Sequence, residues 1–335
     1  MPTRKRPPIL ALLLDISGTL QIGSSPTKNA VDAFHRLRQS SIPFRLCSNS
    51  SKESTAALIT RLDKMGFGIS GADTDIRNKV NDKVGQRRVV WTSIGAVAQM
   101  VRDMGLKKPL LLLTDSASQE VLDAIDGRQK AEGASSEQPS AHDAVVVGLA
   151  PSHFDYPSLN TAFRTLKGET TPAEIPSSSI AVIQQAGANQ SQVPLIATHK
   201  AKYVQTESGL SLGPGPFVTA LEHASGVTAL VVGKPTKAFF HMVIQDFTTD
   251  ELGADAVGPA DDGGNSPRGR IAVIGDDVEA DLGEGAIELG LWRVLVRTGK
   301  YRPGDENRPG IVPPDEISDS FAEFIDSLFS DDKSL

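Results

Sequence analysis

Short apolar runs alternate with amphipathic stretches along most of the chain. Residues 9–14 form a continuous apolar run, which is typical of a strand buried on both faces of a parallel sheet. Residues 27–39 follow with apolar side chains at helical spacing, and residues 44–47 form a second apolar run,. Repeated units of this kind predict an α/β fold in which helices cross over between parallel strands.

The alternation continues to the C-terminus, and a second strand-and-helix series begins at residue 110. Further strands are expected at residues 110–113, 144–147, 194–197, 229–232, 271–274 and 293–296,. The expected helices cover residues 27–39, 52–66, 93–105, 117–126, 155–167, 216–225, 236–247, 279–289 and 318–329,. A chain of 335 residues fits one large domain or two ordinary ones,.

Four stretches lack any periodicity. They are rich in Gly, Ser, Pro, Ala and acidic residues, and we interpret them as mobile surface insertions. They cover residues 70–87, 128–142, 168–192 and 251–269.

Charge and hydropathy exclude two classes of partner. The net charge is −7, and residues 246–335 hold 21 of the 41 acidic residues but 8 of the 34 basic ones. Such a surface repels a polyphosphate backbone, so we expect no nucleic-acid partner. No apolar run reaches 18 residues, so no membrane span is expected.

Cys47 is the only cysteine in the chain. An intramolecular disulfide is therefore impossible, which suits a reducing compartment and predicts a cytoplasmic protein. The short basic cluster at residues 4–6 leaves a nuclear location open, although a solvated terminus is the favoured interpretation,.

Candidate chemistry begins at Asp15, which ends the first apolar run. A carboxylate at the end of a buried strand needs charged or hydrogen-bonding partners, and open parallel sheets bind ligands beyond these strand ends. Gly18 allows the following loop to turn sharply and to present N–H groups to an anion. Taken alone, the segment is equally compatible with an ordinary Asx-turn.

A second acidic cluster follows the apolar run at 271–274. Asp276 and Asp277 are adjacent, and Asp281 lies five residues after Asp276. Neighbouring carboxylates repel unless a cation lies between them, and Mg²⁺ prefers such hard oxygen ligands. Helix capping would explain one of these acids, but not the whole set beside a second strand that ends in Asp.

Two weaker signals follow other strands. Ser48 and Asn49 could hydrogen-bond a phosphoryl group, and Lys234 could balance the charge of Asp15 and a bound phosphate. Individually, a turn and a solvated lysine are the more common explanations. The six histidines show no paired metal-ligand spacing, so packing or surface positions are expected for them,.

In this order and strand context, the motifs resemble those of the haloacid dehalogenase superfamily. Residues 15–20 are similar to its first motif, Ser48 to the second, Lys234 to the third, and residues 275–281 to the fourth. Segments 209–222 and 297–302 narrow the resemblance to a branch with a C2-type cap. The resemblance implies a Rossmann-like core at 1–106 and 207–335, an inserted α/β cap at 107–206, and a possible homodimer through that cap.

The resemblance also implies a mechanism and a cofactor. Asp15 would attack phosphorus and form an aspartyl-phosphate on a small phosphorylated substrate or phosphoamino acid. Ser48, Asn49 and Lys234 would bind the phosphoryl group, with Lys200 as a rival for the cationic role. The implied Mg²⁺ ligands are Asp15, the Ser17 carbonyl and Asp276, with waters oriented by Asp281 and Asp277.

Ser17 departs from the superfamily pattern. Most phosphatases of the superfamily carry a second Asp there, which protonates the leaving group. A positioned general acid contributes roughly 10²–10⁴-fold, so its absence favours labile P–N or P–O–P bonds, on which relatives sharing this serine act.

Three other functions are alternatives to this phosphatase. A weak or inactive binding protein that keeps the fold is the main alternative. A carbon-attacking dehalogenase is disfavoured by the acidic fourth motif. A nucleotide-binding oxidoreductase is disfavoured because no third glycine follows Gly213 and Gly215 at the required spacing,.

Overall fold

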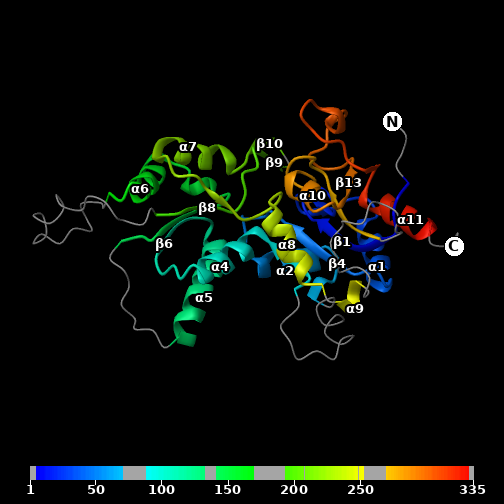
Figure 1. Cartoon of the computed structure of the whole chain (residues 1–335), viewed down its shortest axis with the longest axis horizontal. Helices are drawn as coiled ribbons and strands as arrows, with labels where there is room; N and C mark the ends of the chain where they lie inside the picture. Colours follow the sequence, from blue (N-terminus) through cyan, green and yellow to red (C-terminus); the bar gives the residue numbers. More distant parts are fainter. Residues whose placement is uncertain are drawn as a thin grey trace, which may run out of the picture.

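The molecule has two lobes, each built around a parallel sheet (Figure 1). The computed structural model describes residues 5–70, 88–132, 141–169, 193–206, 208–247, 249–252 and 269–331. The lobe that holds both described chain ends is the core, and the green lobe in Figure 1 is the cap.

The core sheet has six strands in the order β14-β13-β12-β1-β4-β5, and all its neighbours pair in parallel. The predicted α/β class with a parallel central sheet is confirmed. The strands are β1 (Ile9–Asp15), β4 (Phe44–Ser48), β5 (Val90–Thr92), β12 (Arg270–Gly275), β13 (Trp292–Val296) and β14 (Glu316–Ser318).

Helices cover both faces of the core sheet, which explains the continuous apolar run of β1. Leu12 and Leu14 pack in one cluster, whereas Leu13 packs in the other, and all three are fully buried. The first cluster is closed by α1 (Ala30–Gln39), α2 (Thr55–Lys64) and α11 (Phe321–Asp331). The second contains α8 (Lys237–Gln245) and α10 (Glu284–Glu288), and it continues through α4 (Ser93–Asp103) into the cap.

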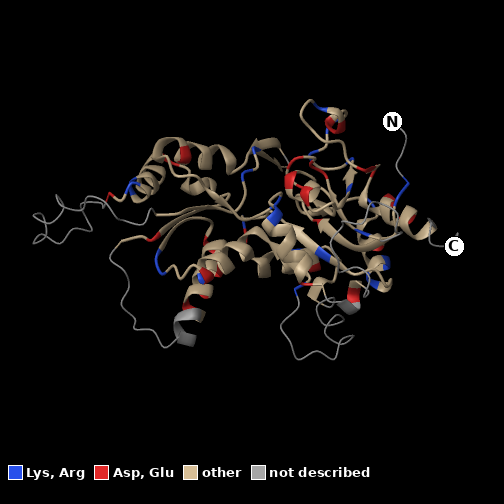
Figure 2. Cartoon of the chain, in the orientation of Figure 1, with Lys and Arg blue, Asp and Glu red and all other residues tan. Residues whose placement is uncertain are grey.

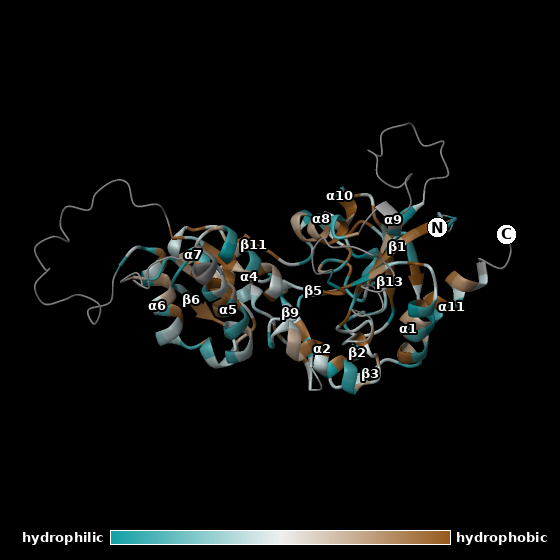
Figure 3. Cartoon of the chain, turned by 90° about the horizontal axis from the view of Figure 1, so that it is seen from below, coloured by the Kyte–Doolittle hydropathy of each residue, from teal (hydrophilic) through white to brown (hydrophobic). Residues whose placement is uncertain are grey.

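The cap sheet has four parallel strands in the order β11-β8-β7-β6. Its helices are α5, α6 and α7, and Figure 3 shows this sheet and its helices at one end of the elongated molecule. The elements are β6 (Pro109–Leu112), α5 (Asp115–Glu132), β7 (Ala144–Val147), α6 (Tyr156–Leu166), β8 (Leu195–Ala197), α7 (Gly215–Ser225) and β11 (Leu230–Val231).

Two strand pairs and three short helices are the smaller elements of the described structure. Two antiparallel hairpins join β2 to β3 and β9 to β10. These elements are β2 (Gln21–Ile22), β3 (Ser25–Pro26), η1 (Pro151–His153), β9 (Tyr203–Thr206), β10 (Gly209–Leu212), α9 (Thr249–Leu252) and η5 (Asp305–Asn307).

The second sheet extends beyond residue 206, the predicted end of the cap. β11 pairs with β8, and Val218 and Leu221 of α7 share a core cluster with Ala162 and Leu166 of α6. The boundary expected from the sequence therefore divides elements that pack together. We propose to extend the cap to residue 232, directly before Gly233.

Some helices begin or end at other residues than the sequence predicts. α5 continues to Glu132, so residues 128–132 of a predicted insertion are helical, and residues 251–252 belong to α9. The helix expected at 279–289 is shortened to α10, because the carboxylate of Asp277 bonds the N–H groups of Glu279 and Ala280 in a turn. Residues 71–87, 133–140, 170–192 and 253–268 of the predicted insertions lie outside the described residues.

Surface charge and hydropathy agree with the composition. In Figure 2, the red segments on α10 and η5 of the core lobe mark acidic residues. Arg6, expected in a solvated terminus, instead bonds Glu316 and Ser327. Within the described part of the chain, no helix combines the length and apolar character needed to cross a bilayer.

A buried arginine ties β4 to the helices that follow the cap. Arg45 is fully buried, and its guanidinium bonds Asp246 at 2.6 Å and Glu251 at 3.2 Å. It also lies 4.2 Å from the ring centroid of Phe247, a favourable cation–π position. β4 ends at Ser48, so this network fixes the strand that carries one of the candidate site residues.

We expect Arg45→Ala to lower the free energy of unfolding by about 3 kcal/mol, because it leaves two partly buried carboxylates without their cation. Urea denaturation would measure this loss. The matched control is Arg297→Ala, which removes an exposed pair with Asp319, whose side chains are 45% and 65% exposed; little change is expected there. Equal losses in the two variants would contradict the assignment.

Candidate active site

The candidate residues meet at the carboxyl edge of the core sheet. β1 lies between β12 and β4. Asp15 is the last residue of β1, Ser48 is the last of β4, and Asp276 directly follows β12. Parallel strands bring these ends to one edge, where open sheets bind ligands. The structure thus places together side chains that are more than 200 positions apart in the sequence.

Lys234 connects two of the acidic side chains. Its Nζ donates to Asp15 Oδ1 at 2.6 Å and to Asp281 Oδ1 at 2.7 Å, and the side chain is 1% exposed. Burial alone would lower the pKa of Lys234, but the two carboxylates outweigh it and raise that pKa above its ordinary value,. Lys234 is therefore a fixed positive charge beside Asp15.

Asn49 holds Lys234 through the main chain. Its Oδ1 accepts from the Lys234 N–H at 2.9 Å, and its Nδ2 donates to the Lys234 carbonyl at 2.9 Å. Both ends of the amide are thus engaged, although the residue lines the pocket. The sequence predicts Asn49 as a phosphate ligand, and these bonds show in addition that it holds the main chain of Lys234.

Ser48 is fully buried at the end of β4 and is not among the residues that line the pocket. Its Oγ accepts from the Ser50 N–H at 3.0 Å. A hydroxyl that accepts one bond still has its own proton to donate.

Three buried carboxylates form a tight cluster. Asp15, Asp276 and Asp281 each offer an oxygen, and these oxygens lie within 4.8 Å of one another. Burial, and then the charge of Asp281, raise the pKa of Asp15 to about 6. Burial and both neighbouring carboxylates raise the pKa of Asp276 well above its usual value. The cluster therefore resists holding all its negative charges without a counter-ion.

The cluster fits a divalent cation. Asp276 Oδ2 accepts from the Lys300 N–H at 2.6 Å, while Asp276 Oδ1 is buried without a hydrogen-bond partner among the described residues. The four carboxylates of the site face the two ammonium groups of Lys234 and Lys300. One divalent cation would neutralise the two remaining negative charges and occupy the unused oxygen, and oxygen ligands of this kind suit Mg²⁺.

Asp277 and Lys300 form a second ion pair at the edge of the cluster. Lys300 Nζ lies 3.2 Å from Asp277 Oδ2, and Asp277 Oδ1 bonds two N–H groups of the following turn. Burial raises the pKa of Asp277, but Lys300 and these N–H groups lower it below its usual value overall. Asp277 therefore stabilises the turn and Lys300, and it lies outside the three-carboxylate cluster.

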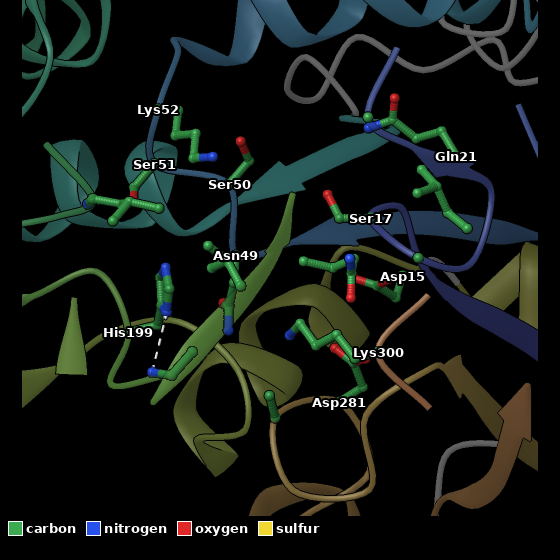
Figure 4. A pocket seen from close by; sticks show the side chains of 18 of the residues that line it. Asp15, Ser17, Gln21, Asn49, Ser50, Ser51, Lys52, His199, Asp281 and Lys300 are labelled. Carbon is green, nitrogen blue, oxygen red and sulfur yellow. Dashed lines mark hydrogen bonds between the residues drawn. The ribbon is translucent and has the colours of Figure 1, made fainter. Parts of the chain in front are cut away.

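A pocket of about 390 Å³ opens above the cluster, between core and cap. Figure 4 shows Asp15, Ser17 and Lys300 on one side and His199 on the other. Ser17 is exposed to this pocket. Three cationic side chains line it, namely Lys52, Arg61 and Lys300, and so do three acidic ones, namely Asp15, Glu53 and Asp281. A divalent cation at the carboxylate cluster would make this balanced lining positive and suited to an anionic ligand.

Sequence reasoning missed Lys300 and His199 as pocket residues. Lys300 follows β13 in a Gly-Lys pair, as Lys234 follows β11, and this repetition was the available signal. His199 was expected to pack or to lie on the surface; it is buried but lines the pocket. Lys200, the rival for the cationic role, pairs instead with Glu222 at 2.7 Å.

Comparisons with protein families agree with this geometry. The family model described as haloacid dehalogenase-like hydrolase matches residues 12–127, and the one described as HAD-hydrolase-like matches residues 231–324.

Two relatives align over nearly the whole chain. Haloacid dehalogenase-like hydrolase domain-containing protein 2 of Homo sapiens is 35% identical and covers 95% of each chain. The phospholysine phosphohistidine inorganic pyrophosphate phosphatase of Homo sapiens is 31% identical, over 96% of this chain and 94% of the relative.

Solved structures share the fold. A 4-nitrophenylphosphatase from Thermotoga maritima has a TM-score of 0.64 at 20% identity and covers 96% of this chain and 97% of that one. NagD from Escherichia coli K-12 has a TM-score of 0.61 at 18% identity and covers 94% and 98%. The predicted core with an inserted C2-type α/β cap is confirmed.

Glycines that pack against Asp276 provide a test of the carboxylate cluster. A Cβ at Gly299 would lie 2.0 Å from Asp276 Oδ2, so we expect Gly299→Ala to displace this carboxylate and weaken Mg²⁺ binding about 10–100-fold. Calorimetric titration would measure the affinity. Gly290→Ala is the matched control, because its φ of +64° resembles the +56° of Gly299 but no atom lies within 4 Å of its Cβ position. Equal affinities in both variants would contradict the cluster as a metal site.

Proposed function

The chain belongs to the haloacid dehalogenase-like hydrolases, and we propose that it is a Mg²⁺-dependent phosphatase that uses Asp15 as a covalent nucleophile. The observation that carries this proposal is the Asp15 carboxylate. It is buried, held 2.6 Å from the Lys234 ammonium, and grouped with Asp276 and Asp281. A positive charge beside a carboxylate nucleophile at the floor of this pocket suits phosphoryl transfer.

In the proposed reaction, a carboxylate oxygen of Asp15 attacks phosphorus and forms a P–O bond. The bond to the leaving group breaks, and its electron pair stays with the departing atom. Water then attacks the aspartyl-phosphate, which releases inorganic phosphate and restores Asp15. Lys234 stays protonated throughout and stabilises negative charge on the phosphoryl oxygens, assisted by the hydroxyl of Ser48.

The proposed metal ligands are Asp15, the Ser17 carbonyl and Asp276. Asp281 is the third carboxylate of the cluster and lies next to them. When bound, Mg²⁺ would supply positive charge to the phosphoryl oxygens. Asp281 shares Lys234 with Asp15, so it orients the lysine as well as contributing charge. We assign Asp277 to the turn and Lys300, in place of the metal role implied by the family resemblance.

The proposed substrate is a small phosphorylated compound or phosphoamino acid. A pocket of about 390 Å³ lined by Lys52, Arg61 and Lys300 supports a compact anionic ligand,. A homodimer through the cap and a cytoplasmic or nuclear location are further proposals, resting on the family resemblance and on the single cysteine.

Ser17 supports a second candidate, a binding protein with little or no turnover. A serine hydroxyl cannot act as an ordinary acid near neutral pH. Against this candidate, the cluster of Asp15, Lys234 and Asp276 is intact, and a protein that only binds has no need of a nucleophile held beside a buried lysine.

Phosphate release with and without Mg²⁺ distinguishes the two candidates. Asp15→Asn removes the nucleophile while preserving its shape, and we expect kcat to fall on the order of 10⁴-fold or more, as when other covalent nucleophiles are removed. Activity that requires both Mg²⁺ and Asp15 is the expected result. No release from a phosphoramidate, pyrophosphate or an aryl phosphate by the unaltered protein would favour the binding protein.

The absence of an acid at position 17 also predicts which substrates have the higher kcat/KM. We expect kcat/KM to be higher for phosphoramidate and pyrophosphate than for sugar phosphates, because alkoxides are the leaving groups that most need protonation. The relative at 31% identity is named as a phospholysine, phosphohistidine and pyrophosphate phosphatase, which supports this order. Faster Mg²⁺-dependent turnover of sugar phosphates would rule out the preference.

A further inference from the structure

His199 brings an unused hydrogen-bond donor to the cap side of the pocket. It lies two residues after β8 of the cap sheet, is 3% exposed, and lines the pocket that contains Asp15. Figure 4 shows Asp15 and His199 entering from opposite walls. The histidine therefore faces the space where a substrate of the proposed reaction would lie.

One bond determines which ring nitrogen carries the proton. The Ala201 N–H donates to His199 Nδ1 at 3.3 Å, so Nδ1 is an acceptor. A neutral imidazole carries one proton, which must then be on Nε2. Among the described residues, no group bonds Nε2.

The surroundings keep the ring neutral. Burial, and then the positive charges of Lys300 and Lys234, lower the pKa of His199 to about 3,. These two lysines are the charged groups that act on it. Around neutral pH, His199 is therefore a hydrogen-bond donor through Nε2, and it is not available as an imidazolium acid.

Two polar side chains reach this pocket from the described cap residues, namely His199 and Gln205. The Gln205 amide is held at both ends: Nε2 donates one of its two hydrogens to the Thr206 carbonyl at 2.8 Å, and Oε1 accepts from Arg302 at 3.1 Å. His199 Nε2 has no such partner among the described residues, so it is the donor that we consider here.

The direction of attack determines what His199 can contact. In phosphoryl transfer the attacking and leaving atoms lie roughly in line through phosphorus. Asp15 approaches from the core sheet, so the leaving group points away from the core, toward the wall that the cap contributes.

We propose that His199 is a catalytic residue that donates a hydrogen bond from Nε2 to the leaving-group atom of the substrate. The role rests on the proposed function, because it presumes attack by Asp15. As the P–O bond breaks, its electron pair stays on the leaving oxygen, and the bond from Nε2–H stabilises that charge. His199 keeps its proton, and the leaving oxygen takes one from water.

The test compares two aryl phosphates with different leaving groups. We expect His199→Phe to reduce kcat/KM on the order of 10²-fold with phenyl phosphate, but no more than about threefold with 4-nitrophenyl phosphate, whose leaving group needs less stabilisation. The ratio kcat/KM is used because it reports the steps up to transfer onto Asp15. His199→Gln, which retains a donor, should recover part of the loss. His241→Gln, on an exposed position of α8, is the control and should change neither value.

Equal losses with both substrates would overturn the proposal, because a purely structural role of His199 affects both alike. No loss with either substrate would overturn it as well.

A second measurement separates this proposal from the proposed function. In ¹⁵N-histidine-labelled Asp15→Asn protein, the Nε2–H resonance of His199 should shift when phenyl phosphate binds. An unchanged resonance in saturated protein would overturn the proposal. A shift without any turnover by the unaltered protein would support the contact and count against the phosphatase alone.

Discussion

The buried ammonium of Lys234 is the interaction on which the rest of the site depends. It binds Asp15 at the end of β1 and Asp281 after β12, while its own segment follows β11 of the cap. Burying three charged groups is costly unless each is paired. The ends of β1 and β12 and the segment around Lys234 must therefore keep their positions relative to one another. Asn49 strengthens this constraint by bonding the Lys234 main chain at both its N–H and its carbonyl.

The same constraint explains the charge pattern around the nucleophile. Lys234 divides one positive charge between two carboxylates, and Lys300 is paired with Asp277. Among the described residues, Asp276 Oδ1 has no hydrogen-bond partner, and a Cβ on Gly18 or Gly299 would lie within 2.0 Å of Asp276 Oδ2. Close packing thus holds Asp276 in place, and a divalent cation would supply the counter-charge that the cluster needs.

The sequence predicted the fold and the strand-end residues because both depend on local pattern. Continuous apolar runs identified β1, β4 and β12. β1 and β4 end in Asp15 and Ser48, and Asp276 directly follows β12. A strand was expected at 229–232, but its pairing with β8, on which our proposed end of the cap rests, depends on a contact between distant segments that local pattern does not show. The pairing of Asn49 with Lys234 was missed for a similar reason, since it joins residues that are 185 positions apart.

Ser17 and His199 also show the limit of what local sequence pattern can predict. Ser17 could be identified from its motif, and a serine there leaves the leaving group without an acid. Whether the pocket compensates depends on side chains that the cap brings from elsewhere in the sequence. A neutral donor fixed by the Ala201 N–H can stabilise a departing anion but cannot protonate it,. Such a site would accelerate reactions whose leaving groups tolerate negative charge, so the absent acid and the buried histidine favour the same class of bond.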